Sequence, residues 1–188
     1  MGIGCKVSLN VIRKARAIFL DRDGVLNRAL VRDGLPYPPT ELAEVEILPG
    51  VLDALLMLKD AGFILITVSN QPDVARGTLE RDAAEEINVY LGERLPIDQF
   101  IMCYHDSADG CVCRKPNPGM LNAGALEFNI DLSKSYMVGD RWRDVDAGNN
   151  AGCKTIFIDY AYAERRPKSY SFIVTSLLEA AQKILSLE

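Results

Sequence analysis

The sequence lacks the features that mark membrane, secreted and nucleic-acid-binding proteins. None of its apolar runs is long enough to span a bilayer, and the N-terminus lacks the charged, apolar and small-residue order of a signal peptide. A basic surplus is also missing, because 21 lysines and arginines face 26 acidic residues and give a net charge of −5. Such a charge argues against a nucleic-acid partner. We therefore expect a cytoplasmic protein with no membrane contact.

Histidine and cysteine are scarce, and most of them occur together. The chain has one histidine and five cysteines, and His105 lies with Cys103, Cys111 and Cys113 in a segment of eleven residues. Tetrahedral Zn²⁺ takes such a set, and a site filled by four protein ligands is structural. The alternative is three unrelated cysteines and a chance histidine. The two other cysteines are expected to be plain small hydrophobes: Cys5 and Cys153.

Apolar runs alternate with helical patterns along the chain, and the composition is that of an ordinary globular protein of one domain, residues 1–188. This alternation predicts an α/β fold, a Rossmann-like three-layer sandwich with a mostly parallel sheet. The expected strands are 17–20, 63–68, 100–104, 136–139, 155–158 and 172–175. The expected helices are 51–61, 79–95, 119–128, 144–151 and 176–187.

Two segments invite more detailed expectations. The irregular stretch 25–49 lies at the mouth of the predicted sheet, and a loop of that length is either a lid or a short hairpin flap. The helix over 51–61 is expected to bury an apolar face made of Leu52, Leu55, Leu56 and Leu58.

Polar side chains follow the expected strands at positions suited to phosphate chemistry. The carboxyl ends of parallel strands meet at one edge of a sheet, where ligands bind. Two acidic ends, one hydroxyl and one lysine therefore converge on one point. Taken singly, each has a plainer explanation, such as helix caps for Ser69 and Asp140 or a surface position for Lys115. The residues, in chain order, are Asp21, Asp23, Ser69, Asn70, Lys115, Asp140 and Asp144.

In this order and placement, the motifs resemble those of the haloacid dehalogenase (HAD) superfamily of phosphatases, over about residues 17–159. The resemblance implies that Asp21 is the nucleophile and that Asp23 is the general acid and then the general base. It also implies that Ser69 and Lys115 hold the phosphoryl oxygens, with Asn70 beside them. A lysine ammonium and a hydroxyl suit this task, because negative charge develops on those oxygens.

The same resemblance implies a catalytic Mg²⁺ bound by Asp21, Asp140 and the backbone carbonyl of Asp23, with Asp144 in support. A phosphomonoester dianion repels an attacking carboxylate, and a bound divalent cation relieves that repulsion.

The cysteine–histidine loop narrows the resemblance to subfamily IIIA. Followed by Arg114-Lys115-Pro116, it resembles the loops of heptose 1,7-bisphosphate phosphatases and of histidinol-phosphate phosphatases. The continuation 117–120 and the ending Ala75-Arg76-Gly77 favour the heptose group, which implies a small phosphorylated sugar as substrate. Pro72-Asp73 departs from the usual Ser-Gly pair, so histidinol phosphate and other phosphosugars stay open. A phosphoacceptor switch is disfavoured, because Asp23 would speed turnover.

The chain has no room for a separate cap domain. Only 45 residues separate Asp23 from Ser69, and 45 separate Ser69 from Lys115, and both stretches already hold predicted helices and strands. We expect an open, monomeric enzyme in which short loops select the substrate. Arg76, Arg114 and Arg141 are candidate contacts for a second phosphate or for sugar hydroxyls, or else ordinary salt-bridge partners. Trp142 is expected to pack in the pocket wall, and 160–166 to border the pocket.

Overall fold

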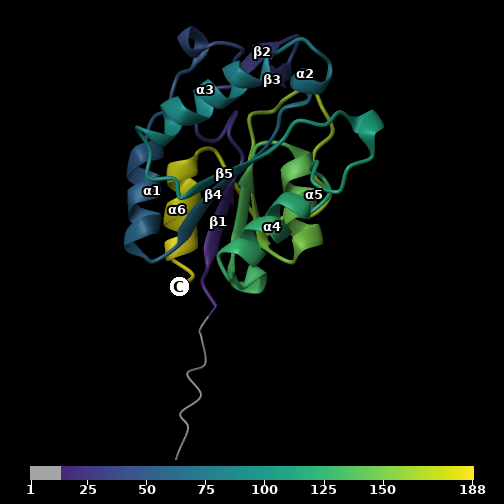
Figure 1. Ribbon diagram of the computed structural model, residues 1–188. Helices are drawn as coiled ribbons and strands as arrows, with labels where there is room; N and C mark the ends of the chain where they lie inside the picture. Colours follow the sequence, from purple (N-terminus) through teal and green to yellow (C-terminus); the bar gives the residue numbers. More distant parts are fainter. Residues whose placement is uncertain (1–13) are drawn as a thin grey trace, which may run out of the picture.

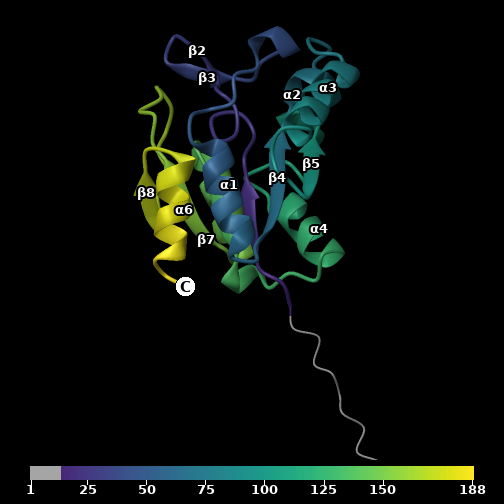
Figure 2. The same ribbon diagram turned by 90° about the vertical axis from the view of Figure 1, so that its left-hand side faces the viewer.

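The computed structural model describes residues 14–188, so the expectation for Cys5 lies outside the described part (Figures 1 and 2). At its centre is a six-stranded sheet in which every pairing is parallel, with strand order β5-β4-β1-β6-β7-β8. The predicted α/β fold with a parallel sheet is confirmed. The strands are β1 (Ala17–Leu20), β4 (Ile64–Asn70), β5 (Gln99–Cys103), β6 (Tyr136–Gly139), β7 (Lys154–Ile158) and β8 (Phe172–Val174).

Helices cover both faces of the sheet (Figure 1). One face carries α1 (Val51–Asp60), α3 (Arg81–Gly92) and α6 (Leu177–Leu185), and the other carries α4 (Gly119–Glu127) and α5 (Trp142–Ala151). A four-residue helix, α2 (Pro72–Ala75), follows β4 and was not predicted. Three short 3₁₀ turns complete the list: η1 (Leu42–Glu44), η2 (Ser107–Asp109) and η3 (Leu132–Lys134).

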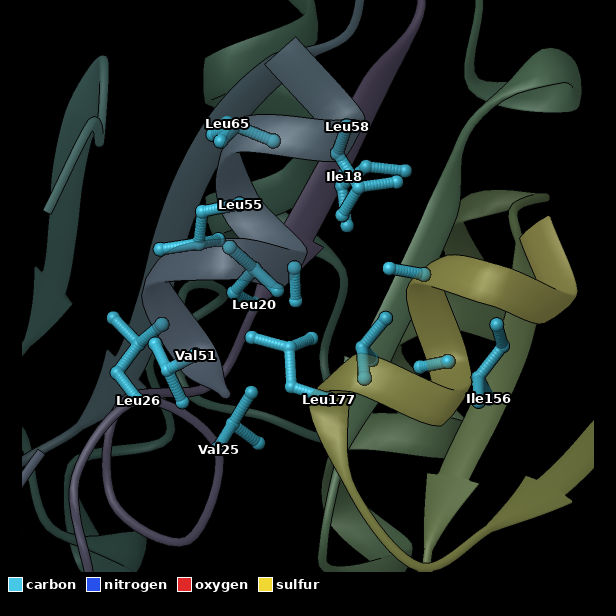
Figure 3. Close-up of a cluster of buried hydrophobic side chains, with 14 of the residues drawn as sticks. Ile18, Leu20, Val25, Leu26, Val51, Leu55, Leu58, Leu65, Ile156 and Leu177 are labelled. Carbon is cyan, nitrogen blue, oxygen red and sulfur yellow. The ribbon is translucent and has the colours of Figure 1, made fainter. Parts of the chain in front are cut away.

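The alternation of side chains along β1 divides the core into two clusters. Ile18 and Leu20 pack with α1 and α6 (Figure 3), whereas Ala17 and Phe19 pack with α4 on the opposite face. Each fully buried Leu, Ile or Phe side chain contributes about 1.5–3 kcal/mol. These two clusters therefore fix the strand whose carboxyl end carries Asp21.

The predicted apolar face of α1 is partly wrong. Leu52 and Leu56 are 45% and 46% exposed. The buried face consists of Val51, Ala54, Leu55 and Leu58. A run with so many leucines offers two overlapping faces, and packing against α6 selects one of them.

The topology places a crevice beside β1. The chain moves from β1 outward to β4 and β5 on one side, and later to β6 and β7 on the other side. The helices that make these crossings lie on opposite faces, so β1 and β6 flank a topological switch point, where ligands bind in open α/β sheets.

The stretch 25–49 forms the short hairpin flap that was one of its two expected structures. Strands β2 (Leu30–Arg32) and β3 (Leu35–Tyr37) pair antiparallel. Asp33 and Gly34 connect them with φ angles of 52° and 76°, the positive values that a two-residue hairpin turn requires. At the tip, the Ala163 amide donates a hydrogen bond to the Gly34 carbonyl (2.8 Å). Figure 2 shows the flap at the end of the sheet opposite the C-terminus.

Neither stretch between the motifs holds a separate cap domain in the described part of the chain. None of the helices found between Lys14 and Glu188 is long and apolar enough to cross a membrane.

Candidate active site

Asp21 follows β1 directly and is 7% exposed. Its Oδ1 accepts a hydrogen bond from the Arg22 amide (2.8 Å) and lies 2.9 Å from Nζ of Lys115. Its Oδ2 forms no hydrogen bond with any described residue, and Asp21 lines a cleft at the switch point. Burial, followed by the charge of Asp144, raises the pKa of Asp21 to about 6, although Lys115 opposes the shift. Oδ2 of Asp21 is therefore the oxygen placed to react with a group in the cleft.

Lys115 is buried among acceptors. Its Nζ lies 2.6 Å from Asp144 Oδ1 and 2.9 Å from Asp21 Oδ1, and it donates a hydrogen bond to the Val68 carbonyl (2.8 Å). Burial lowers the pKa of Lys115, but the two carboxylates outweigh burial and raise it above its ordinary value. The plainer explanation, a surface lysine, is wrong.

Asn70 fixes the backbone of Lys115. Its Oδ1 accepts from the Lys115 amide (3.0 Å), and its Nδ2 donates to the Lys115 carbonyl (3.0 Å). Asn70 was predicted to contact phosphate; it does line the cleft, and its side-chain amide is engaged in positioning the lysine.

Asp140 and Asp144 lie beside Asp21 but differ in their surroundings. The three residues offer carboxylate oxygens that lie within 4.8 Å of one another. Asp144 is satisfied, because its Oδ1 contacts Lys115 and its Oδ2 accepts from the Arg141 amide (2.9 Å), which also caps α5. Both oxygens of Asp140 are buried and have no hydrogen-bond partner within residues 14–188. Burial, followed by the charges of Asp21 and Asp144, raises the pKa of Asp140 well above its ordinary value.

This donor set fits a divalent cation. Mg²⁺ prefers carboxylate and carbonyl oxygens, and two orphaned oxygens of a buried carboxylate beside a second carboxylate provide them. Backbone packing supports the same point, because a Cβ at Gly24 would lie 1.9 Å from Asp140 Oδ2. Only glycine permits the chain to pass so close to that carboxylate. The side chain of Asp23 lies outside the carboxylate group; the expected ligand there is its backbone carbonyl.

Gln71 joins the expected acid–base residue to the expected phosphate-binding hydroxyl. Its Nε2 donates to Asp23 Oδ2 (2.7 Å) and to Ser69 Oγ (3.1 Å). Asn27 Nδ2 also donates to Asp23 (3.0 Å). Ser69 lies within β4, so a helix cap is not its role; Gln71 is the residue before α2. Gln71 was not predicted as a site residue, although it directly follows the Ser69-Asn70 motif.

The cleft has a volume of about 240 Å³ and an arginine-rich rim. Arg76 contacts Asp73 (3.1 Å) and Asp106 (2.9 Å), and Arg141 forms two hydrogen bonds with Glu164 (2.9 and 2.6 Å). Both predicted contacts line the cleft, but each is paired with carboxylates.

Two other rim arginines have no carboxylate partner within the described part of the chain: Arg114 and Arg143. Arg114 donates to the His105 carbonyl (3.1 Å). Burial, followed by the nearby charge of Arg141, lowers the pKa of Arg143. Arg143 was not predicted, although it stands two residues after Arg141 in the same turn of helix.

Trp142 was expected in the pocket wall, but it lines two neighbouring cavities and not the cleft. Its ring is held between two guanidinium groups, with the Cζ atoms of Arg143 and Arg165 at 4.7 and 3.4 Å from the ring centroid. The segment 160–166 lines neighbouring cavities and not the cleft itself. Two pairs connect this segment with the site. Glu164 binds Arg141, and Tyr162 lies beside Asp140, so that burial, followed by the charge of Asp140, raises the pKa of Tyr162.

The cysteine–histidine cluster forms as predicted, on the loop after β5. Sγ of Cys113 lies 3.3 Å from Sγ of Cys103, Sγ of Cys111 and Nδ1 of His105, and Cys103 lies 3.7 Å from Cys111 and from His105. These separations are far too long for a disulfide, whose S–S distance is about 2.05 Å. They are near the ~3.8 Å edge of a tetrahedron built on Zn–S bonds of about 2.3 Å. The donor set therefore fits Zn²⁺.

The chain is similar to phosphatases of one family. The HAD-hydrolase-like family model matches residues 112–180. The D-glycero-beta-D-manno-heptose-1,7-bisphosphate 7-phosphatase of Pasteurella multocida is 32% identical over 187 residues, which cover 92% of this chain and 98% of that protein. The enzyme of the same name from Escherichia coli K12 is 36% identical over 154 residues, 74% of this chain and 78% of that one.

A crystal structure gives the same result. The D,D-heptose 1.7-bisphosphate phosphatase from B. bronchiseptica, complexed with magnesium and phosphate, has a TM-score of 0.77 and 30% identity to this chain. The match covers 92% of this chain and 99% of that one. The chain therefore belongs to the family of HAD-like phosphatases that contains the heptose 1,7-bisphosphate phosphatases.

Proposed function

We propose that this phosphatase removes the 7-phosphate of D-glycero-D-manno-heptose 1,7-bisphosphate through an aspartyl-phosphate, in precursor synthesis for lipopolysaccharide or surface glycans. One observation carries the chemistry: Asp21 and Lys115 line the cleft together, and the unpartnered carboxylate of Asp140 lies within 4.8 Å of Asp21. The names of the relatives in Pasteurella and Escherichia support the substrate.

In the first half-reaction, Oδ2 of Asp21 attacks phosphorus, and the bond from phosphorus to the sugar oxygen breaks. Lys115 and Ser69 hold the phosphoryl oxygens as negative charge develops on them. Asp23 donates a proton to the leaving oxygen, because an alkoxide is a poor leaving group. In the second half-reaction, Asp23 takes a proton from water, the water oxygen attacks phosphorus, and the bond to Asp21 breaks.

Asp21 and Asp140, with the backbone carbonyl of Asp23, would hold Mg²⁺, and Asp144 would orient Lys115 beside them. When bound, the ion supplies positive charge that offsets the repulsion between the phosphate dianion and the attacking carboxylate.

The rim of the cleft supports a substrate with two phosphates. Arg114 and Arg143 are the cleft arginines without a carboxylate partner among residues 14–188. Guanidinium groups bind phosphate through paired hydrogen bonds. We place the second phosphate against these two side chains, while Lys115 and Ser69 hold the phosphate that reacts.

The cysteine cluster completes the proposal. Zn²⁺ bound by Cys103, His105, Cys111 and Cys113 would stiffen the loop that leads into Lys115. Asn117 closes the second half of this loop around Lys115, since its Nδ2 donates to the Cys111 carbonyl (2.9 Å). Thiols kept as metal ligands suit the reducing cytoplasm, so we propose a cytoplasmic enzyme. We also propose that it acts as a monomer.

Steady-state phosphate release with Mg²⁺ tests the proposal. The panel contains both anomers of heptose 1,7-bisphosphate, histidinol phosphate and several sugar monophosphates. We expect kcat/KM for one heptose anomer to exceed the others by about a hundredfold, or ~2.7 kcal/mol. A preference for histidinol phosphate would overturn the substrate, and turnover retained by Asp21→Asn would overturn the nucleophile.

A further inference from the structure

Arg22 stands between the two aspartates of the first motif and is among the largest fully buried side chains of the protein. It does not line the cleft. Burying a charged group costs several kcal/mol unless partners satisfy it. The contacts that satisfy this guanidinium therefore indicate what the residue does.

All three guanidinium nitrogens of Arg22 are engaged, on two sides. Toward the active site, Nε lies 3.2 and 3.3 Å from the two oxygens of Asp23, and Nη2 lies 3.2 Å from Oδ2. Toward α3, Nη1 donates to Asn88 Oδ1 (3.0 Å) and to the Ala84 carbonyl (3.3 Å). The guanidinium thus links the carboxylate of Asp23 to the backbone and side chain of a helix.

The link continues beyond α3. Asn88 Nδ2 donates to Glu85 Oε2 (3.0 Å), and the Tyr104 hydroxyl donates to Glu85 Oε1 (2.6 Å). Tyr104 directly follows β5, at the start of the cysteine–histidine loop. A continuous set of hydrogen bonds therefore connects Asp23 with two rigid elements of the fold.

We propose that Arg22 is a positioning residue that holds the carboxyl group of Asp23 in the orientation needed for its two proton transfers, with Asn88 as its anchor. This inference rests on the proposed function, in which Asp23 is the acid and then the base. Asp23 also accepts from Asn27 and Gln71, but among residues 14–188 only Arg22 contacts both of its oxygens. The planar guanidinium group of Arg22 is anchored on α3 and contacts both carboxyl oxygens, so it fixes the rotation of the Asp23 carboxyl plane. A single hydrogen-bond donor does not fix that rotation.

The role predicts a particular kinetic signature. An alkyl phosphate needs the proton of Asp23 when its phosphorus–oxygen bond breaks, whereas p-nitrophenolate leaves without one. Hydrolysis of the aspartyl-phosphate needs Asp23 as base for both substrates. Misorienting Asp23 therefore slows both half-reactions with the sugar phosphate but only the second with p-nitrophenyl phosphate.

The experiment compares Arg22→Gln and Asn88→Ala with the wild type in rapid-mixing assays. With p-nitrophenyl phosphate, we expect Arg22→Gln to release p-nitrophenol in a burst equal to the enzyme concentration. The phosphoenzyme then decays about thirtyfold more slowly than in the wild type, within the ~10²–10⁴ that acid–base catalysis contributes. Asn88→Ala keeps the contacts to Asp23 and removes one anchor, so we expect a smaller effect of the same kind. Arg16→Gln, at the other end of β1, is the matched control and should show no burst.

A double-mutant cycle separates positioning from general support of the fold. In the Asp23→Asn background, Arg22→Gln should change the rate of phosphoenzyme decay by less than about twofold, because the residue acts through Asp23. If the two substitutions instead multiply, or if Arg22→Gln and Asn88→Ala lower both half-reactions equally without a burst, the proposal is overturned. If Arg22→Gln does not fold, the Asn88→Ala and Asp23→Asn pair gives the same decision. The cycle uses p-nitrophenyl phosphate, so its result is independent of which sugar phosphate the wild type prefers.

Discussion

Replacing Asp140 by asparagine is expected to stabilise the metal-free protein and to remove its response to Mg²⁺. Asp140 is 2% exposed, and neither of its carboxylate oxygens has a hydrogen-bond partner within the described residues. Three carboxylates of this buried cluster face a single ammonium group, that of Lys115. The folded protein without metal therefore bears the cost of an unsatisfied carboxyl group, whether that group is charged or protonated.

The size of the expected stabilisation follows from the carboxyl group of Asp140 that the substitution removes. An unsatisfied buried polar group costs about 1–3 kcal/mol, and a charged one costs more. The amide of the new asparagine would have carboxylate oxygens of Asp21 and Asp144 as acceptors, since these lie within 4.8 Å of the Asp140 oxygens. We therefore expect a net gain of about 2 kcal/mol. For a chain of 188 residues, this gain corresponds to about 4–8 °C in Tm.

Thermal unfolding in EDTA and in Mg²⁺ measures both parts of the prediction. A ligand that binds only the folded state, at a hundred times its Kd, stabilises it by about 2.7 kcal/mol, so Mg²⁺ should raise the Tm of the wild type and not that of Asp140→Asn. Asp146→Asn, on the neighbouring helix α5, removes a surface partner of Arg165 and is the control, expected to change stability by less than about 0.5 kcal/mol. A variant less stable than the wild type in EDTA, or one that gains equally from Mg²⁺, would refute the reasoning.

Three further outcomes are expected. In EDTA, the free energy of unfolding should fall by about 2–3 kcal/mol as pH rises from about 4 to 7. The reason is that folding raises the pKa of Asp21 from 3.8 to about 6, so the folded protein binds this proton more tightly than the unfolded chain. Urea unfolding at several pH values measures this free energy, and a value that rises with pH contradicts the prediction. Cys111→Ser should lower both the zinc content and the Tm, because a ligand of the folded state is lost; a zinc-free wild type of unchanged stability contradicts it. Arg143→Ala should raise KM for the bisphosphate about tenfold, as expected for one charged hydrogen bond, while changing KM for a monophosphate less than twofold; equal effects on both substrates contradict it.

The sequence was sufficient to predict the convergence of Asp21, Asp140 and Lys115, because parallel topology brings strand ends together. The two aspartates directly follow strands that the apolar pattern reveals, and Lys115 lies in the segment that leads from β5 into α4. Once the sheet is parallel, their convergence follows from the direction of the strands. The cysteine–histidine cluster could also be predicted from the sequence. Its four residues lie close together in the chain, so their proximity in space does not depend on the fold.

The features that were not predicted depend on how the elements pack, and the spacing of residues along the chain does not determine that packing. The choice between the two leucine faces of α1 is made by contact with α6, and the four residues of α2 are too few to show a helical period. Arginine is usually a surface residue, so the sequence does not suggest that Arg22 is buried. Its burial and its contacts with α3 and Asp23 depend on where α3 packs. The partners of Arg76 and Arg141 lie 30 and 23 residues away, so their pairing becomes visible only in the folded chain.

This pairing bears on how an open site can be selective. A cleft lined by four arginines and a lysine would attract any phosphorylated molecule if all five charges were free. Carboxylates neutralise Arg76 and Arg141, and Lys115 is held between Asp21 and Asp144. The charge available to a second anion is thereby confined to Arg114 and Arg143, on the side of the cleft formed by the cysteine–histidine loop and α5. In the proposed function, a loop held by Zn²⁺ would serve specificity as well as stability, because it would fix the distance between the reacting phosphate and the second one.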